Sequence, residues 1–132
     1  MSRLSERIEN FNKAFELFTE MQAKYTKDKV NNSNRLALVQ SFEIIFELSW
    51  KVLKDYLYTK DIEAFTPRDV IKSAFAAEIL PSAQIWIDMA RDRNASSHEY
   101  STEKVDIILE RISTIYFEEL SRFRKQTGVF YE

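Results

Sequence analysis

The segment from Asp92 to Tyr100 carries the residues best suited to chemistry. It holds the single histidine of the chain, His98, and an arginine, Arg93, five positions earlier. A histidine with its ordinary pKa of about 6.5 can exchange a proton near neutral pH. On a continuous helix, side chains five residues apart point well away from each other. We therefore expect Arg93 and His98 to converge only if the helix breaks between them or a second copy of the chain supplies the other half.

The stretch between these two residues, Asn94 to Ser97, contains small polar side chains. Such side chains favour helix termination, because they compete for backbone hydrogen bonds. A simpler explanation accounts for the same composition. A polar connection between helices would contain serine, asparagine and an exposed histidine by chance, with Arg93 capping a helix C-terminus. The spacing alone leaves both interpretations open.

Other kinds of active site fit the sequence poorly. With one histidine and no cysteine, a metal site would need carboxylates such as Glu43, Glu47, Asp88 and Asp92. Acids at helical spacing more often pair with a lysine or arginine one turn away, so we expect no metal and no cofactor. A chain with one glycine also has no G-x-S-x-G elbow for a serine hydrolase and no glycine-rich phosphate loop.

Composition narrows the class of protein. The 132 residues, 45% hydrophobic and 30% charged, are typical of one soluble globular domain. Nineteen basic and 21 acidic residues give a net charge of −2, so any nucleic-acid contact must be local or built by an assembly. The chain has no cysteine, no apolar run long enough to span a bilayer and no signal-peptide core. We therefore expect a cytoplasmic protein with no membrane partner.

Helices should position the motif, because one glycine and two prolines favour long helices with few connections. Apolar spacings of three and four predict helices over about 4–26, 35–59 and 104–127, with short ones after Pro67 and Ser82. Thr66 is placed to cap one helix, and Gly128 to stop the last. The last helix is expected to bury Val105, Ile108, Ile112, Ile115, Tyr116, Leu120 and Phe123.

The fold class that follows is all-α, with residues 1–132 forming a single bundle of three long and two short helices. The helix over 35–59 is apolar on more than one side, since Ile44 and Leu48 lie off its main stripe. It therefore needs a second burial partner, either other helices or a second chain. Glu43 and Glu47 lie one turn apart in this apolar helix, where acids generally require partners.

Three blocks of sequence, taken in order, resemble one known family. The first is F-E-x-x-x-E-L-x-W-K-x-L-K-x-Y-L over 42–57, and the second is T-P-R over 66–68. The third is W-x-D-M-x-x-D-R-N-x-x-S-H-x-Y over 86–100, which contains the string R-x4-H-x-Y. Together they resemble the HEPN-type nucleotidyltransferase substrate-binding proteins, a family that includes HepT-like toxins. The resemblance spans nearly the whole chain.

This resemblance implies an antiparallel four-helix bundle with short extra helices, which forms a homodimer with the motif near the dimer groove. It implies a partner as well, a minimal nucleotidyltransferase usually encoded by an adjacent gene. In characterised members the HEPN protein is a toxin that cleaves RNA without metal, and the nucleotidyltransferase is the antitoxin that transfers AMP to the motif tyrosine, here Tyr100. The implied catalytic residues are Arg93, His98 and Asn94, supported by Glu43, Glu47, Trp50, Lys51, Trp86, Asp92 and Ser97.

These residue types suit such a reaction. RNA brings its own nucleophile, the 2′-OH, so the protein needs a base, charge stabilisation and alignment. Arg93 can hold the phosphate bidentately, Asn94 can orient either group, and a dimer would supply the second imidazole for the second proton transfer. AMP on Tyr100 would add bulk and negative charge beside His98. We expect a metal-independent endoribonuclease toxin acting on an RNA such as tRNA or mRNA. The alternatives are a non-catalytic nucleotide- or substrate-binding subunit of a nucleotidyltransferase, and a structural helical adaptor.

Overall fold

The computed structural model describes residues 2–98 and 102–130, and the side chains of Ser97, His98 and Thr102 lie outside this description. Helices account for the regular structure of these residues, with no strand among them. They are α1 (Arg3–Lys27), α2 (Asn32–Thr59), α3 (Pro67–Ala76), α4 (Ala83–His98), α5 (Thr102–Arg111), the π-helix η1 (Ile112–Tyr116) and α6 (Phe117–Thr127). The predicted all-α class is confirmed. No helix in the described part combines the length and apolar character needed to cross a bilayer.

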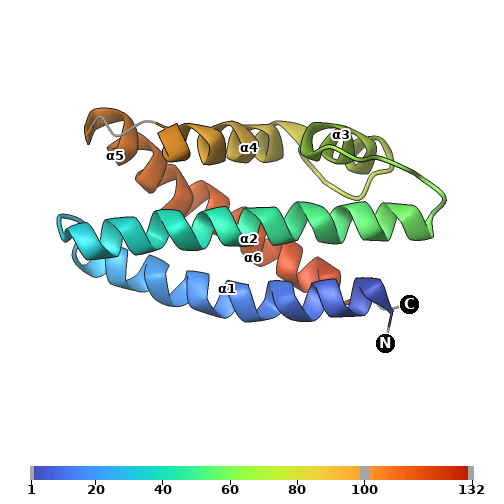
Figure 1. Cartoon of the computed structure of the whole chain (residues 1–132), viewed down its shortest axis with the longest axis horizontal. Coiled ribbons are helices and arrows are strands. Elements are labelled where there is room, and N and C mark those ends of the chain that lie inside the picture. Colours follow the sequence, from blue (N-terminus) through green and yellow to red (C-terminus); the bar gives the residue numbers. More distant parts are fainter. Residues whose placement is uncertain (1, 99–101, 131–132) are drawn as a thin grey trace.

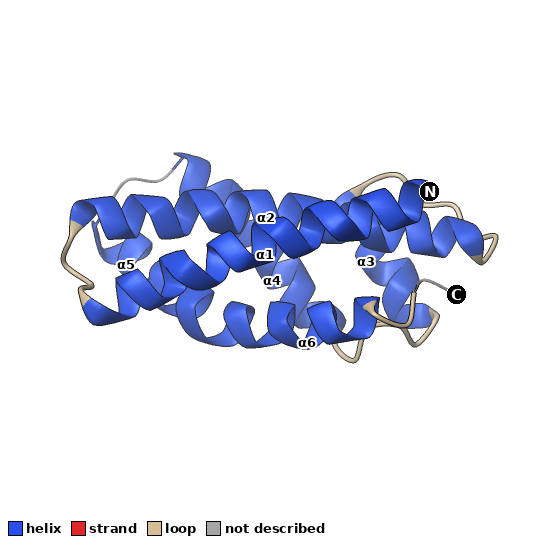
Figure 2. Cartoon of the chain, turned by 90° about the horizontal axis from the view of Figure 1, so that it is seen from below, coloured by secondary structure: helices blue, strands red, loops and turns tan. Residues whose placement is uncertain are grey.

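The long elements run antiparallel along one axis (Figure 1). α1 and α2 form a hairpin, and α4 runs back along the other side of α2. α5, η1 and α6 follow one another without a break and form one rod, whose α6 end lies in a second layer (Figure 2). The start of α1 and the end of α6 lie at the end of the bundle opposite the end of α4 and the start of α5 (Figure 1). The end of α4 that carries Arg93 is therefore at the other end of the molecule from the start of α1.

Side-chain caps fix where the helices begin. The Thr66 hydroxyl accepts from the Asp69 N–H at 3.2 Å, which confirms the predicted cap of α3. The Ser82 hydroxyl accepts from the Ile85 N–H at 3.4 Å at the start of α4. The Asn31 side chain accepts from the Asn34 N–H at 3.0 Å, so α2 begins at Asn32, three residues earlier than the apolar pattern predicted.

Two helices end in a left-handed residue that is not glycine. Asp61, after α2, has φ 62°, and Glu78, after α3, has φ 61°. The residue that follows each donates its N–H back across the helix end, Ile62 to the Leu57 carbonyl and Ile79 to the Ala74 carbonyl. These are Schellman-type ends, where glycine is the usual residue.

Gly128 follows the last helix as predicted, but it does not use its conformational freedom. α6 ends at Thr127, and Gly128 has φ −60° and ψ −26°, a right-handed conformation open to any residue. Successive N–H groups at 128, 129 and 130 donate to carbonyls three residues earlier. The helix therefore tightens into a turn. The predicted end of the helix before Gly128 is confirmed, but Gly128 does not adopt the left-handed conformation expected of a glycine that ends a helix.

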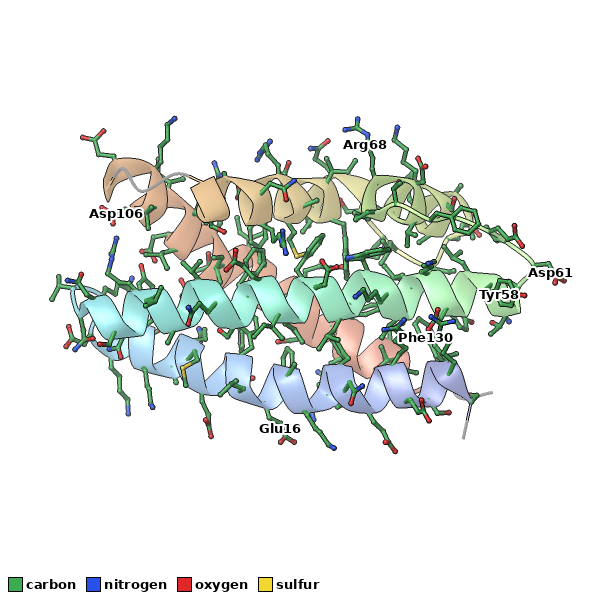
Figure 3. The ribbon with its side chains drawn as sticks, viewed as in Figure 1. Glu16, Tyr58, Asp61, Arg68, Asp106 and Phe130 are labelled. Atoms are coloured by element: carbon green, nitrogen blue, oxygen red, sulfur yellow. The ribbon has the colours of Figure 1, made fainter. Side chains whose placement is uncertain are left out.

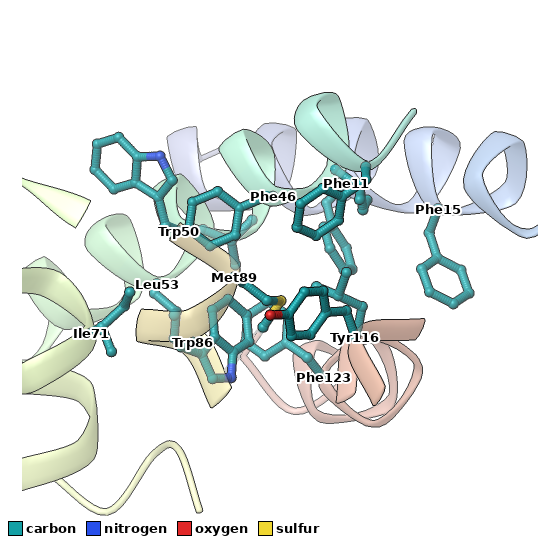
Figure 4. Close-up of a cluster of buried hydrophobic side chains, with 14 of the residues drawn as sticks. Phe11, Phe15, Phe46, Trp50, Leu53, Ile71, Trp86, Met89, Tyr116 and Phe123 are labelled. Carbon is teal, nitrogen blue, oxygen red and sulfur yellow. The ribbon is translucent and has the colours of Figure 1, made fainter. Parts of the chain in front are cut away.

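Aromatic side chains form much of the core. Phe123 lies edge-on to both Phe11 and Trp86, with ring centroids 5.5 and 5.1 Å apart, and joins α6 to α1 and α4. Phe42 of α2 stacks on Tyr116 at 5.5 Å, and Phe46 lies 6.4 Å from Trp86. Figure 4 shows Trp86, Met89, Tyr116 and Phe123 grouped together, next to Phe46 and Trp50 of α2. The core is therefore continuous between α4, α2 and the last rod.

The last rod departs from the predicted burial pattern at two positions. Ile115 is 51% exposed and Val105 is only half-buried, whereas Tyr116, Leu120 and Phe123 are buried as predicted. Buried residues at 108, 112, 116 and 120 repeat every four positions, which drifts by about 40° per step on an α-helix of 3.6 residues per turn. The wider π turn of η1 corrects this drift, because its hydrogen bonds join residues five apart. The pattern of threes and fours did not anticipate the extra residue.

Candidate active site at the end of α4

α4 continues without a break through the motif, from Ala83 to His98. The predicted helix termination between Asn94 and Ser97 is therefore wrong. The Ser96 hydroxyl donates to the Arg93 carbonyl at 2.9 Å, so its polar group is satisfied inside the helix instead of ending it. The backbone of α4 is helical from Arg93 to His98, so the helix break that would let the two residues converge within one chain is absent. The other arrangement that the sequence allowed, with a second copy of the chain, stays a prediction.

The structure locates part of the predicted motif. Arg93 is half-buried and Asn94 is exposed. The backbone of Ser97 and His98 forms the last residues of α4, and their side chains lie outside the described residues, as does Tyr100 altogether. Residues 93–98 of the motif therefore form the C-terminal end of α4 (Figure 1).

Asp92, predicted as a supporting residue, is a buried carboxylate that ties α4 to the last rod. Asp92 is 3% exposed. Arg111 Nη1 donates to both carboxylate oxygens, at 3.1 and 2.9 Å, and the Tyr116 hydroxyl donates to Oδ2 at 2.5 Å. Arg91 Nε lies 3.6 Å from Oδ1. We call the set of Asp92, Arg111 and Tyr116 the Asp92 clamp. A buried carboxylate needs such donors, because its desolvation is otherwise costly.

The electrostatics of the clamp keep its donors protonated. Burial, reinforced by the hydrogen bond to Asp92, raises the pKa of Tyr116 well above its ordinary value. The hydrogen bond to Asp92 likewise raises the pKa of Arg111. Tyr116 therefore remains a neutral hydroxyl donor, and Arg111 a cation, throughout the physiological pH range.

Trp86 forms a second connection between α4 and the last rod, two turns upstream. Its indole N–H donates to Glu119 Oε2 at 2.8 Å, and Trp86 itself is fully buried. Arg122 donates to both oxygens of Glu119, at 2.9 and 2.8 Å. Trp86 lies about 18 Å along the helix axis from His98, at 1.5 Å per residue. Its role is to hold α4 in the bundle, and it does not reach the motif.

The predicted supporting residues on α2 divide into two groups. Phe42 stacks on Tyr116, which donates to Asp92, so its neighbour Glu43 lies at the same height along the bundle as Asp92 and Arg93. Glu43 is half-buried. Glu47 and Lys51 form an ion pair at 3.7 Å within α2. Such a partly exposed pair contributes little stability.

Trp50, the last of the predicted supporting residues, is 8% exposed and packs in the core. Its indole N–H has no hydrogen-bond partner among the described atoms. It lies two turns of α2 beyond Glu43. The structure therefore brings Glu43 and Asp92 to the height of Arg93, but leaves Trp50 and Lys51 further along the bundle.

The middle and the end of α5 are held by the hairpin of α1 and α2. Lys29 Nζ donates to Glu110 Oε1 at 2.9 Å, and the hydroxyl of Tyr25 donates to Glu110 Oε2 at 3.3 Å. Arg35 forms an ion pair with Asp106. Figure 3 shows Asp106 at this end of the bundle and Tyr58 and Phe130 at the other. These contacts therefore attach α5 to the hairpin at a distance from the motif.

A cavity of about 880 Å³ lies at the end of the bundle that carries the termini. It is lined by Arg3, Lys54, Tyr58, Phe65 and Phe130 among others. Among the side chains that the structure describes, no group of three histidine, cysteine or acidic residues is placed to hold a metal ion.

Sequence reasoning missed Arg111 and Glu119 as partners of the motif helix. Two signals were present. Tyr116 was placed in the core, and a buried tyrosine hydroxyl usually has a partner. Glu119 also interrupts an apolar stripe, as Glu43 does in α2. Neither signal identifies the partner, because both bonds join residues far apart in the chain.

The fold and this arrangement define a small all-α bundle that presents a polar motif at the end of one firmly held helix. The chain matches a family model described as "Nucleotidyltransferase substrate binding protein like" over residues 6–128. It belongs to this family.

Three comparisons with individual proteins agree with this assignment. A Haemophilus influenzae protein named "Probable ribonuclease HepT" is 29% identical over 85 residues. This match spans 61% of the chain and 58% of that relative's own length. A crystal structure of a protein from Thermus thermophilus has a TM-score of 0.77 at 26% identity, covering 92% of this chain and 99% of that one. A Haemophilus influenzae structure has the same TM-score at 23% identity, with 92% and 98% coverage. Its description is the fold of a substrate-binding domain of a nucleotidyltransferase.

Proposed function

We propose that this protein is a cytoplasmic, metal-independent endoribonuclease toxin, regulated by a minimal nucleotidyltransferase that transfers AMP to Tyr100. The observation that supports the proposal is that the R-x4-H string forms the C-terminal end of α4. There Asp92, the residue before Arg93, is buried and held by two donors. A ribonuclease needs its phosphate-binding and proton-transfer groups on a rigid support, and the clamp provides one. The name of the curated relative supports the same activity.

The reaction needs two copies of the chain. One His98 takes the proton of the ribose 2′-OH, and the 2′-oxygen attacks the adjacent phosphorus. The bond from phosphorus to the 5′-oxygen breaks, and His98 of the second copy protonates that leaving oxygen, leaving a cyclic phosphate and a 5′-hydroxyl. Arg93 of each copy stabilises the negative charge on the phosphate, and Asn94 orients the reacting groups.

Exposed apolar side chains support a homodimer. Leu36 and Ile44 on α2 are 59% and 51% exposed, and Ile107 on α5 is 54% exposed. Light scattering at micromolar concentration should give twice the mass of the chain, 15.7 kDa. A monomer at that concentration would contradict the two-histidine mechanism.

The activity is tested by RNA cleavage and growth inhibition. His98→Ala and Arg93→Ala should each abolish both, while the free energy of unfolding changes by about 1 kcal/mol or less, as for substitutions outside the core. Glu9→Ala is the control, because it removes a charge from an exposed side chain near the start of α1, which has no role in the mechanism, and should leave cleavage intact. EDTA should have no effect. Cleavage by the His98 variant at the level of the parent would refute the mechanism.

Regulation is tested by co-expression with the partner nucleotidyltransferase. Peptide mass spectrometry should find one or more AMP groups on the segment that contains Tyr100. Tyr100→Phe removes only the hydroxyl, so this variant should escape modification and remain toxic in the presence of the antitoxin. An unmodified Tyr100 beside a competent nucleotidyltransferase and ATP would remove the regulatory half of the proposal.

A second function is favoured by the family description and by the description of one structural neighbour, which both refer to substrate binding for a nucleotidyltransferase. In that case Arg93 and His98 would bind a nucleotide or another anion without turning it over. The His98→Ala variant separates the two functions. If the protein is a binding subunit, the parent protein will not cleave RNA. His98→Ala will then weaken only the nucleotide binding that titrations measure.

A further inference from the structure

The π turn brings two side chains to one side of the last rod. Arg111 ends α5 and Tyr116 ends η1, five residues later. On a regular α-helix, residues five apart point about 140° away from each other. Across the π turn, the N–H of Phe117 donates to the carbonyl of Ile112, so residues five apart fall close to the same face. Arg111 and Tyr116 can therefore both meet Asp92.

The π turn is itself held in place from α1. The side-chain amide of Gln22 donates to the Ser113 carbonyl at 3.0 Å, inside η1. A π turn leaves main-chain groups without their ordinary partners four residues away, and side chains then satisfy them. Ser113 and Thr114 also donate their hydroxyls to the Glu110 carbonyl, at 3.2 and 2.5 Å. The wide turn is thus a defined part of the fold.

The carboxylate that receives both donors is next to the motif. Asp92 precedes Arg93, and it lies about 9 Å along the axis of α4 from His98. The other described connection of α4 to the last rod, from Trp86 to Glu119, is twice as far away. Two donors from one rod, meeting both oxygens of one carboxylate, fix the rotation of α4 about its axis as well as its position.

We propose that Arg111 and Tyr116 are positioning residues for RNA cleavage, which act through Asp92 to set the direction in which α4 presents Arg93 and His98. This inference rests on the proposed ribonuclease function. Arg111 and Tyr116 need not touch RNA. They hold the rotation of the motif helix, and a small rotation at Asp92 moves the end of a long arginine side chain by much more than it moves the backbone. Misplacement of about 1 Å at a reacting group can cost 100-fold in rate.

The test compares two tyrosines by the same substitution. Tyr116→Phe removes the hydroxyl on Asp92 and keeps the ring that stacks on Phe42. Tyr25→Phe is the matched control, because Tyr25 is equally buried and also donates to a carboxylate of the last rod, that of Glu110. Each variant is measured at a temperature where circular dichroism shows that it is fully folded. The readouts are kcat and KM for RNA cleavage, and amide hydrogen exchange of a peptide from α4 that contains residues 90–98.

We expect Tyr116→Phe to lower kcat at least tenfold with little change in KM, and to speed amide exchange at the end of α4 about tenfold. Tyr25→Phe should change neither. Exchange that stays the same in Tyr116→Phe would overturn the proposal, whether or not the protein cleaves RNA. Faster exchange with an unchanged kcat would also overturn it, because the clamp would then be only structural. A parent protein as inactive as His98→Ala would refute the ribonuclease function instead, and the exchange result alone would then decide whether the clamp fixes α4.

Discussion

Replacing Glu119 with alanine should destabilise the protein by about 2–4 kcal/mol. The indole N–H of Trp86 is fully buried and donates to Glu119 at 2.8 Å, so its loss of an acceptor costs about 1–3 kcal/mol. The buried methylene groups of Glu119 add about 1 kcal/mol. Arg122 adds little, because its side chain is 38% exposed and water can replace its partner. Urea unfolding should show the loss as a lower midpoint with an unchanged slope.

Two further variants isolate the cause of this loss. Glu119→Gln keeps an oxygen that can accept from Trp86, so it should cost less than half as much as the alanine variant. In a Trp86→Phe background the donor is absent, and Glu119→Ala should then cost at least 1 kcal/mol less than in the parent. An equal cost in both backgrounds would refute the reasoning, because the unsatisfied indole would not be its source. So would a total loss below about 1 kcal/mol.

Three other outcomes are expected. Deletion of Ile115 should leave the protein folded and within about 1 kcal/mol of the parent, because the buried residues beyond it then return to spacings of three and four on a regular helix; a loss above 3 kcal/mol in urea unfolding would contradict this. Glu78→Gly should raise the free energy of unfolding by about 0.5–1 kcal/mol, because φ 61° strains any residue except glycine. Serine at the same position serves as a control that should show no gain. The pKa of Glu110 is lowered below its ordinary 4.5, mainly by the hydrogen bond from Lys29. Ionised Glu110 therefore stabilises the fold above pH 4.5, and this stabilisation is lost as the pH falls through the pKa that Glu110 has in the folded protein. Glu110→Gln should flatten the stability profile between about pH 5 and pH 3, and an unchanged profile in acid titrations would count against the interaction.

Local signals in the sequence predicted the helices well. The cap at Thr66 and the start near Ser82 depend on side chains within a few residues of the backbone groups that they satisfy. Periodicity also predicted most of the core, since a buried face needs only the spacing of apolar residues. These features follow from interactions between residues close together in the chain.

The sequence could not predict what depends on distant residues. Whether Ser96 ends α4 or bonds within it is decided by how firmly the helix is held, and that depends on Asp92, Arg111 and Tyr116 together. The π turn is equally hidden, because only packing against α1 and α4 shows that Ile115 is the extra residue. Physical chemistry alone also left the motif open between an active site and a polar connection. The order of the three sequence blocks indicated the family, which the match over residues 6–128 confirms, and the role of the motif stays a prediction.

The hairpin of α1 and α2 has a consequence for how the chain folds. These two helices are joined by a turn of only four residues, 28–31, so their contacts form between segments close in sequence and can be made early. The hydrogen bonds of Asp92 and Glu119 join α4 to the last rod. They can form only after both of these elements have packed into the bundle. Substitutions in these bonds should therefore speed unfolding and leave the refolding rate almost unchanged. The unfolding rate would then depend on the bonds that hold α4, whereas the folding rate depends on the contacts between α1 and α2.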